Sequence, residues 1–134
     1  MQRRLQRLSL LMGVFFMVQC THQNPDNFTG YYEGVFILTE KGSKKEGLAS
    51  LRLRDSTYQS VGQQSPVPAG GSGTWEVQDT ALVFRDKNIW TADFDWHLIL
   101  DGRYRYELNR DSLILQTIKP NGNTYTYRLK RMKP

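Results

Sequence analysis

The feature that most constrains this chain is an alternation of apolar and polar residues that recurs between residues 94 and 131. Aromatic residues and leucines occupy every second position in several short runs, and charged or polar residues stand between them. Successive side chains of a β-strand point to opposite faces of a sheet, so a period of two predicts strands with one buried face. Antiparallel sheets with one face on a core show this pattern. We therefore expect four antiparallel strands in this region.

Turn lengths test this assignment, because a shift of one residue turns every side chain to the opposite face. A two-residue Asp-Gly turn places Leu98 opposite Arg105 and fails the test. Loops at 101–103, 110–111 and 120–122 keep the apolar residues on one face, and the Pro-Asn-Gly of the third suits a type I turn that ends in a left-handed glycine. The predicted pairs are Leu98 with Tyr106, Trp96 with Leu108, Leu108 with Leu113, Tyr106 with Leu115, Leu115 with Tyr127 and Leu113 with Leu129.

The first half of the chain carries the same signals. A two-residue turn at 79–80 pairs Val77 with Leu82 and Trp75 with Phe84. A charged segment at 41–47 and a segment rich in Gly, Ser and Pro at 62–73 are expected to be loops. The strands expected before residue 90 cover 28–40, 48–54, 57–61, 73–77 and 82–84.

Eight or nine short strands with turns at this spacing predict an all-β fold, a small antiparallel meander β-barrel that resembles the lipocalins. No stretch after the leader has the period of an amphipathic helix. The first strand is apolar on both faces after Gly34, so we expect it either to be covered on both sides or to bend across a barrel corner at that glycine.

A leader precedes this domain. Arg3, Arg4 and Arg7 form a basic start, and the apolar run at 8–18 is too short to span a bilayer as a helix. This pattern predicts a secretory signal peptide. Cys20, the single cysteine of the chain, follows the apolar run where a bacterial lipoprotein carries its lipid. Gln19 stands where a small residue is expected, so ordinary cleavage to a soluble product is the alternative.

The predicted organisation is a leader at 1–20, a polar tether at 21–27 and one β-barrel domain at 28–134. A lipid on Cys20 implies anchoring to the outer membrane, on its periplasmic or surface side. The alternative is a soluble periplasmic or secreted protein. The formal charge of +5 falls to +2 without the three leader arginines, and basic residues alternate with acidic ones, so nucleic acid is not an expected partner.

Candidate chemistry is sparse. Asp93, Asp95 and His97 share one strand face and could hold a divalent cation. The alternation places them on the outward face, where a solvated row opposite Glu107 and Asn109 is the preferred interpretation. No serine elbow, Cys-His pair, phosphate loop or inward carboxylate pair is present in the domain. We predict no enzyme activity, no cofactor and no metal site.

The inward-facing aromatic residues are the candidate ligand-binding set. They form either a packed core or the wall of a cavity, and both interpretations stay open at this point. Buried tyrosine hydroxyls need partners, which a ligand or water in a cavity can supply. The set is Tyr32, Phe36, Trp75, Phe84, Trp96, Tyr104, Tyr106, Tyr125 and Tyr127.

The order of these segments resembles the N-terminal domain of the NlpE-type envelope lipoproteins. The likeness covers most of the chain, and it implies an envelope-anchored barrel. The Cys-x-x-Cys pair of that family is missing, because the corresponding position reads Phe36-Ile37-Leu38-Thr39-Glu40, so copper and redox roles do not carry over. The likeness rests on Tyr31-Tyr32-Glu33-Gly34-Val35, on Leu51-Arg52-Leu53 with Asp55-Ser56-Thr57-Tyr58, on Gly73-Thr74-Trp75 with Leu82-Val83-Phe84, and on Asn109-Arg110-Asp111-Ser112-Leu113-Ile114-Leu115 with Tyr127-Arg128-Leu129.

Three functions are carried forward. The first is a non-enzymatic envelope lipoprotein whose barrel binds a small apolar or amphipathic ligand or senses envelope state. The second is a protein–protein interaction module of the envelope with a solid barrel core. The third, an enzyme, has no supporting residue pattern. An open aromatic-lined cavity favours the first function, and a filled interior favours the second.

Overall fold

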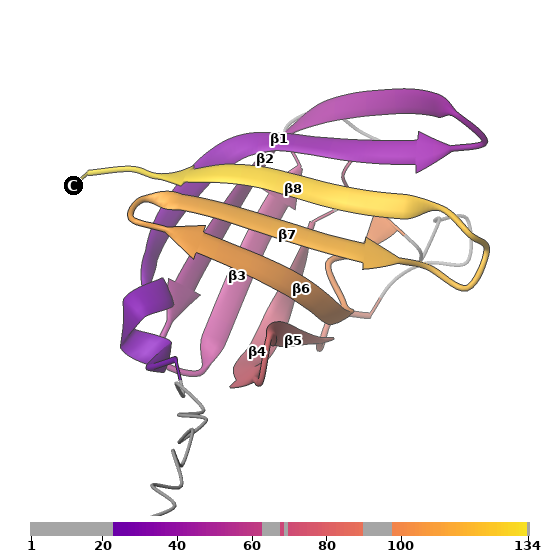
Figure 1. Ribbon diagram of the computed structural model, residues 1–134. Helices are drawn as coiled ribbons and strands as arrows, with labels where there is room; N and C mark the ends of the chain where they lie inside the picture. The colour runs from indigo at the N-terminus through magenta and orange to yellow at the C-terminus, as the bar shows by residue number, and fades with distance from the viewer. Residues whose placement is uncertain (1–22, 63–67, 69, 90–97, 134) are drawn as a thin grey trace, which may run out of the picture.

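The chain forms a closed antiparallel β-barrel in a computed structural model, which describes residues 23–62, 68, 70–89 and 98–133 (Figure 1). Neighbouring strands follow the order of the chain, and β8 returns to pair with β1. The predicted fold class is therefore confirmed. The elements are the 3-10 helix η1 (Pro25–Phe28), β1 (Gly30–Glu40), β2 (Ser43–Arg54), β3 (Thr57–Gly62), β4 (Gly71–Gln78), β5 (Ala81–Asp86), β6 (Gly102–Asn109), β7 (Ser112–Ile118) and β8 (Thr124–Arg131).

Most of the predicted hairpin register is confirmed. Two-residue turns at 55–56, 79–80 and 110–111 join β2 to β3, β4 to β5 and β6 to β7. At the β7–β8 connection, Gly122 has a φ of 86° and donates its N–H to the Lys119 carbonyl, as expected of a type I turn that ends in a left-handed glycine. The confirmed pairs are Val77 with Leu82, Trp75 with Phe84, Tyr106 with Leu115, Leu108 with Leu113, Leu115 with Tyr127 and Leu113 with Leu129.

The predicted strand at 94–100 is wrong where the structure describes it. Residues 98–100 make a short turn with a single bridge between Ile99 and Gly70, and β6 pairs with β5 instead. Leu98 is therefore not opposite Tyr106, and no loop exists at 101–103, because β6 starts at Gly102. The alternation predicted correctly which residues of β6 face inward, but not which strand pairs with β6. Leu82 of β5 also faces inward, so its pairing with Tyr104 fits the alternation equally well. Trp96 lies outside the described residues.

Two loop boundaries also differ from expectation. The connection between β1 and β2 is only Lys41 and Gly42, because residues 43–47, expected in a loop, extend the pairing with β1. The first strand begins at Gly30, after η1, and residues 71–73 belong to β4. The β1–β2 hairpin projects beyond the rest of the barrel (Figure 1).

Two glycines allow the barrel to curve tightly. A Cβ atom at Gly34 would lie 1.9 Å from the carbonyl oxygen of Arg128 on β8, and one at Gly73 would lie 2.0 Å from that of Arg85 on β5. Backbone therefore passes too close to these positions for any side chain. The predicted corner at Gly34 corresponds to this close approach.

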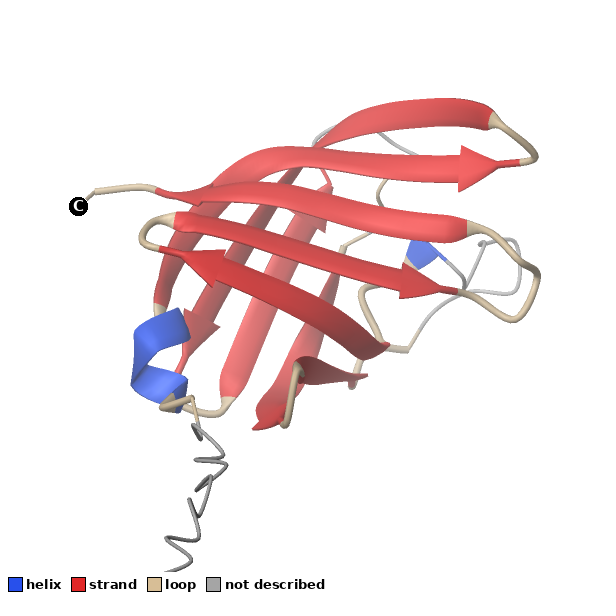
Figure 2. Cartoon of the chain, in the orientation of Figure 1, coloured by secondary structure: helices blue, strands red, loops and turns tan. Residues whose placement is uncertain are grey.

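The two ends of the barrel differ. The three two-residue turns lie at the end that η1 covers, while the β1–β2, β3–β4, β5–β6 and β7–β8 connections lie at the other, which we call the loop end (Figure 2). No helix in the described part of the chain is long and apolar enough to cross a membrane.

Candidate functional site

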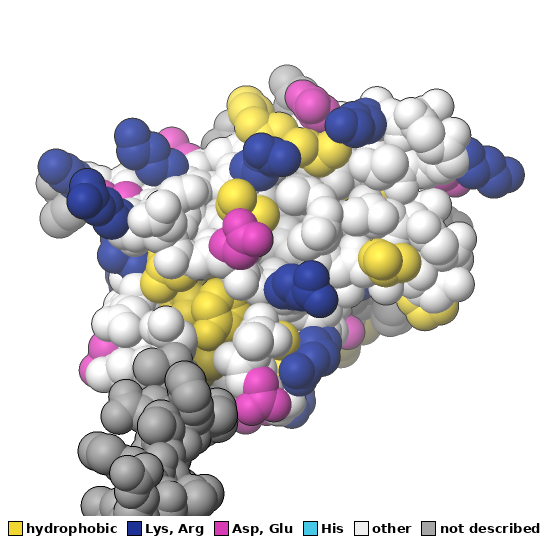
Figure 3. All heavy atoms as spheres, in the orientation of Figure 1, with side chains coloured by type: hydrophobic (Ala, Val, Ile, Leu, Met, Phe, Trp, Pro, Cys, Tyr) yellow, Lys and Arg dark blue, Asp and Glu magenta, His cyan; other side chains and the backbone are white. Residues whose placement is uncertain are grey.

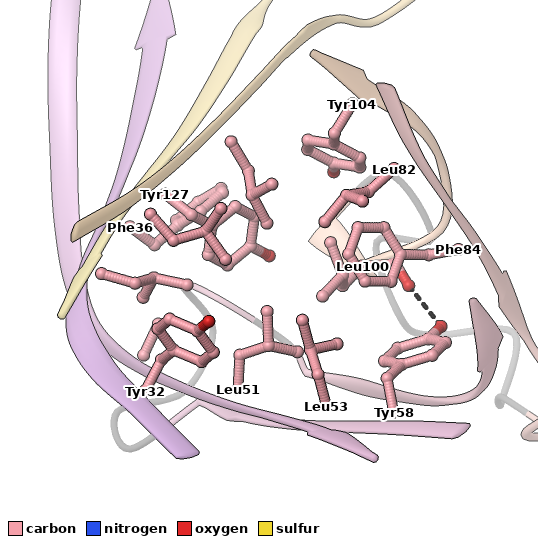
Figure 4. Close-up of a cluster of buried hydrophobic side chains, with 14 of the residues drawn as sticks. Tyr32, Phe36, Leu51, Leu53, Tyr58, Leu82, Phe84, Leu100, Tyr104 and Tyr127 are labelled. Carbon is pink, nitrogen blue, oxygen red and sulfur yellow. Dashed lines mark hydrogen bonds between the residues drawn. The ribbon is translucent and has the colours of Figure 1, made fainter. Parts of the chain in front are cut away.

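The eight predicted inward aromatic residues that lie in the described ranges do line the barrel interior (Figure 4). Seven of them are at most 4% exposed, and Tyr106 is half-buried against the same cluster. They come from strands on all sides of the barrel, and leucines from β2, β5 and β7 fill the spaces between them. The seven are Tyr32, Phe36, Trp75, Phe84, Tyr104, Tyr125 and Tyr127.

Their rings pack edge to face in a chain across the interior. The ring centroids of Phe84 and Tyr104 are 5.8 Å apart, and those of Tyr104 and Tyr127 are 5.9 Å apart. Phe36 stands at 89° to Tyr125 with centroids 5.5 Å apart. These are favourable aromatic geometries. Because these side chains have almost no surface in contact with water, they pack as a core where they lie.

Phe28 of η1 closes one end of the interior. Its ring is fully buried and stands edge-on to Tyr106 and Trp75, with centroids 4.9 Å and 6.2 Å away. The Tyr32 hydroxyl donates to the Phe28 carbonyl at 2.8 Å and accepts from the Arg131 guanidinium at 2.7 Å. Burial raises the pKa of Tyr32, and the nearby Arg131 charge opposes that shift.

Arg131 ties three segments together at this end. Besides Tyr32, its guanidinium donates to the Asn27 carbonyl and lies 3.7 Å from the Asp111 carboxylate. The last residue of β8 therefore holds η1 and the β6–β7 turn. This contact joins residues about one hundred positions apart in the sequence.

Residues 98–100 close the loop end. Leu98, Ile99 and Leu100 are all buried, although they are not part of a strand. The Leu100 carbonyl accepts the Tyr58 hydroxyl at 2.6 Å, and its N–H donates to the Gly70 carbonyl at 2.8 Å (Figure 4). Both backbone polar groups of the buried Leu100 are thus paired, as burial requires.

Lys119 borders the loop end. Its ammonium group donates to the Asp101 carbonyl at 3.2 Å and lies 5.5 Å and 5.3 Å from the ring centroids of Tyr104 and Tyr125. These are cation–π distances. Burial lowers the pKa of Lys119, and the Asp101 charge partly offsets this effect. A cation here sits beside the aromatic interior without entering it.

Three buried polar atoms among the described residues have no hydrogen-bond partner, namely Trp75 Nε1, Tyr104 Oη and Tyr127 Oη. Burial raises the pKa of both tyrosines, so both hydroxyls are neutral near pH 7. Each hydroxyl can donate one hydrogen bond and accept others. These atoms are the main departure of the interior from a fully satisfied core.

Several predicted positions lie outside the described residues. They are Cys20, Trp96 and the row of Asp93, Asp95 and His97, so the structure does not bear on them. Among the described residues, no group of three His, Cys, Asp or Glu side chains could hold a metal ion.

Sequence reasoning missed three parts of this interior. Tyr58 shares the inward parity of Leu53, its partner on β2, and that signal could have identified it. Phe28 and Lys119 lie outside the strands, where alternation gives no information. Alternation did place Leu98 and Leu100 on the inner face, and both are buried, although they do not form the expected strand.

Compared with models of protein families, with curated proteins and with solved structures, the chain has no match. The resemblance to NlpE-type lipoproteins therefore stays a prediction.

Proposed function

We propose that this chain is a non-enzymatic lipoprotein of the bacterial envelope whose barrel serves as an interaction module with a solid core. The observation that carries the proposal is the closed interior. Phe36, Tyr104 and Tyr127 are at most 1% exposed, Phe28 covers one end and Leu100 covers the other. A barrel filled in this way presents its outer wall and its turns to partners.

The outer wall offers apolar side chains for such contacts. Ile118 is 73% exposed, and Leu48 and Val61 are about half exposed on adjoining strands. Val83 and Ile114 also point outward and are half-buried. Figure 3 shows hydrophobic side chains interspersed with Lys and Arg on the face that carries β6, β7 and β8. Protein interfaces are enriched in Arg beside apolar and aromatic side chains.

The proposed lipid on Cys20 would fix the orientation of the barrel. Four residues separate Cys20 from η1, which an extended chain spans in about 14 Å. The end covered by η1 would therefore lie near the membrane, and the loop end would point away from it. The loop end is then the part of the barrel that is most accessible to envelope partners.

Mass spectrometry of the native protein, gently extracted from envelopes, tests the proposal. The expected result is a mass that includes a lipid on Cys20 and no retained small molecule. Replacing Cys20→Ala is expected to release the protein from membranes. A protein that stays membrane-bound after this change, or that was soluble before it, contradicts the anchoring.

Binding of a small apolar or amphipathic ligand is the second candidate, because Tyr104 and Tyr127 have unpaired hydroxyls in the interior. A polar group of such a ligand could pair with them if residues 98–100 moved aside. A ligand retained in the native mass spectrum, and lost in a Tyr104→Phe variant, would support this function over the solid interaction module.

A further inference from the structure

A groove on the outer wall of β5, β6 and β7 has the chemistry of an oxyanion site. Its volume is about 360 Å³, which lies at the small end of ligand sites. Arg103 and Arg105 line it side by side from β6, and Thr80, Gln116 and Thr117 also border it. None of the described residues that line it is acidic. The groove therefore offers hydrogen-bond donors and two positive charges.

Within the described part of the chain, neither guanidinium group has a partner of opposite charge. Neither Arg103 nor Arg105 forms an ion pair with any carboxylate in the described ranges. On the same barrel, Arg85 is paired with Glu76 at 2.6 Å. Arg103 is also oriented, because it donates to Gln78 Oε1 at 3.0 Å. Two unpaired guanidinium groups in one hollow favour an anion.

Ala81 makes the hollow possible. It pairs with Arg105 across the β5–β6 ladder and faces outward, since its neighbour Leu82 faces the core. Its small side chain is nevertheless buried, as the floor of the groove. Ile118 forms an apolar wall and is 73% exposed. A ligand can thus place a charged group on the arginines and a short apolar part on Ile118.

We propose that this groove binds a phosphate group, either as the free ion or as the head of a phosphate monoester. Two guanidinium groups can each donate two parallel hydrogen bonds to a tetrahedral dianion, and they balance its charge. A carboxylate carries one charge and satisfies a single guanidinium fork. The inference goes beyond the proposed function and does not depend on lipidation or on the interior.

NMR titration of the ¹⁵N-labelled full chain in detergent micelles tests the proposal directly. Inorganic phosphate and glycerol 3-phosphate are added separately at constant ionic strength, with acetate as the reference anion. The expected result is a saturable shift of the Arg103 and Arg105 side-chain N–H signals, with a Kd in roughly the millimolar range. Binding of inorganic phosphate alone would indicate a site for the free ion. A preference for glycerol 3-phosphate would indicate a monoester head group.

Three variants make the result decisive. Arg105→Gln is expected to weaken phosphate binding about tenfold or more, because it removes a charge-assisted pair of hydrogen bonds. Ala81→Leu fills the hollow and is expected to have a similar effect while both arginines remain. Arg128→Gln removes the same charge from the exposed face of β8, outside the groove, and is the matched control. Equal affinities for Arg105→Gln and Arg128→Gln, equal shifts with acetate, or the absence of saturation would overturn the proposal.

Discussion

Two tyrosine-to-phenylalanine changes in the interior are expected to alter stability in opposite directions. The Tyr58 hydroxyl donates to the buried Leu100 carbonyl at 2.6 Å, so Tyr58→Phe leaves that carbonyl unpaired. The expected cost is about 1–3 kcal/mol of unfolding free energy. The Tyr104 hydroxyl is buried without a partner, which costs the native state a similar amount, about 1–3 kcal/mol. Tyr104→Phe removes that cost and is expected to stabilise the barrel.

Urea unfolding at pH 7 measures this contrast. With a slope of about 2 kcal/mol per molar urea and a difference of about 4 kcal/mol between the variants, their midpoints should lie about 2 M apart, on opposite sides of the parent protein. Tyr106→Phe is the control, because its hydroxyl bonds the Asp79 carbonyl near the surface, and a change within about 0.5 kcal/mol is expected. If Tyr104→Phe destabilises the protein as much as Tyr58→Phe, then the Tyr104 hydroxyl has a partner in solution. The description of the interior as a solid core would then be refuted.

Three further outcomes are expected. Gly34→Ala should lower the free energy of unfolding by at least about 3 kcal/mol or prevent folding, because its Cβ would lie 1.9 Å from the Arg128 carbonyl oxygen. The control Gly42→Ala, in an open turn at φ +80°, should cost only about 1 kcal/mol, and equal urea midpoints for the two variants would contradict this. Arg131→Lys should make η1 more susceptible to limited proteolysis, because an ammonium group cannot reproduce the bonds of the guanidinium fork, and unchanged cleavage would argue against that clamp. Burial raises the pKa of several interior tyrosines in the folded state, while the unfolded chain keeps the ordinary value of about 10. The free energy of unfolding should therefore be constant up to about pH 10 and fall above it by about 1.4 kcal/mol per pH unit for each such residue. Urea midpoints between pH 9 and 12 would measure this fall, and a flat profile would contradict it. These tyrosines are Tyr58, Tyr104 and Tyr127.

Hairpins were predictable from the sequence because their register depends on neighbouring residues. The turn at 110–111 fixes the pair of Leu108 and Leu113 by loop length alone. The partner of β6 was not predictable in this way. Alternation assigns Tyr104 to the inner face whether its neighbour is Leu82 of β5 or a strand at 94–100. Which of the two pairs with β6 depends on how the whole barrel closes.

The sites were less predictable than the strands. The inward aromatic residues followed from alternation, and so did the inward side of Leu98 and Leu100. The covering by Phe28 and the bonds of Leu100 to Tyr58 and Gly70 did not, because these segments lie outside any strand. The groove over Ala81 depends on the pairing of β5 with β6, whereas alternation predicts a strand at 94–100 as the partner of β6. The alternation within each strand therefore predicts which residues face the barrel interior. Contacts between distant segments determine how the ends are covered and where the outer groove forms.

The pairing of β1 with β8 has a consequence for the order of folding. Each hairpin can form as soon as its own residues are available, but β1 has to wait for β8, which follows it by more than eighty residues. Closing so long a loop costs entropy that is recovered only when the last strand docks. Arg131 reinforces this dependence, because η1 has no clamp until β8 is in place. An emerging chain therefore cannot close its barrel until its final strand is available.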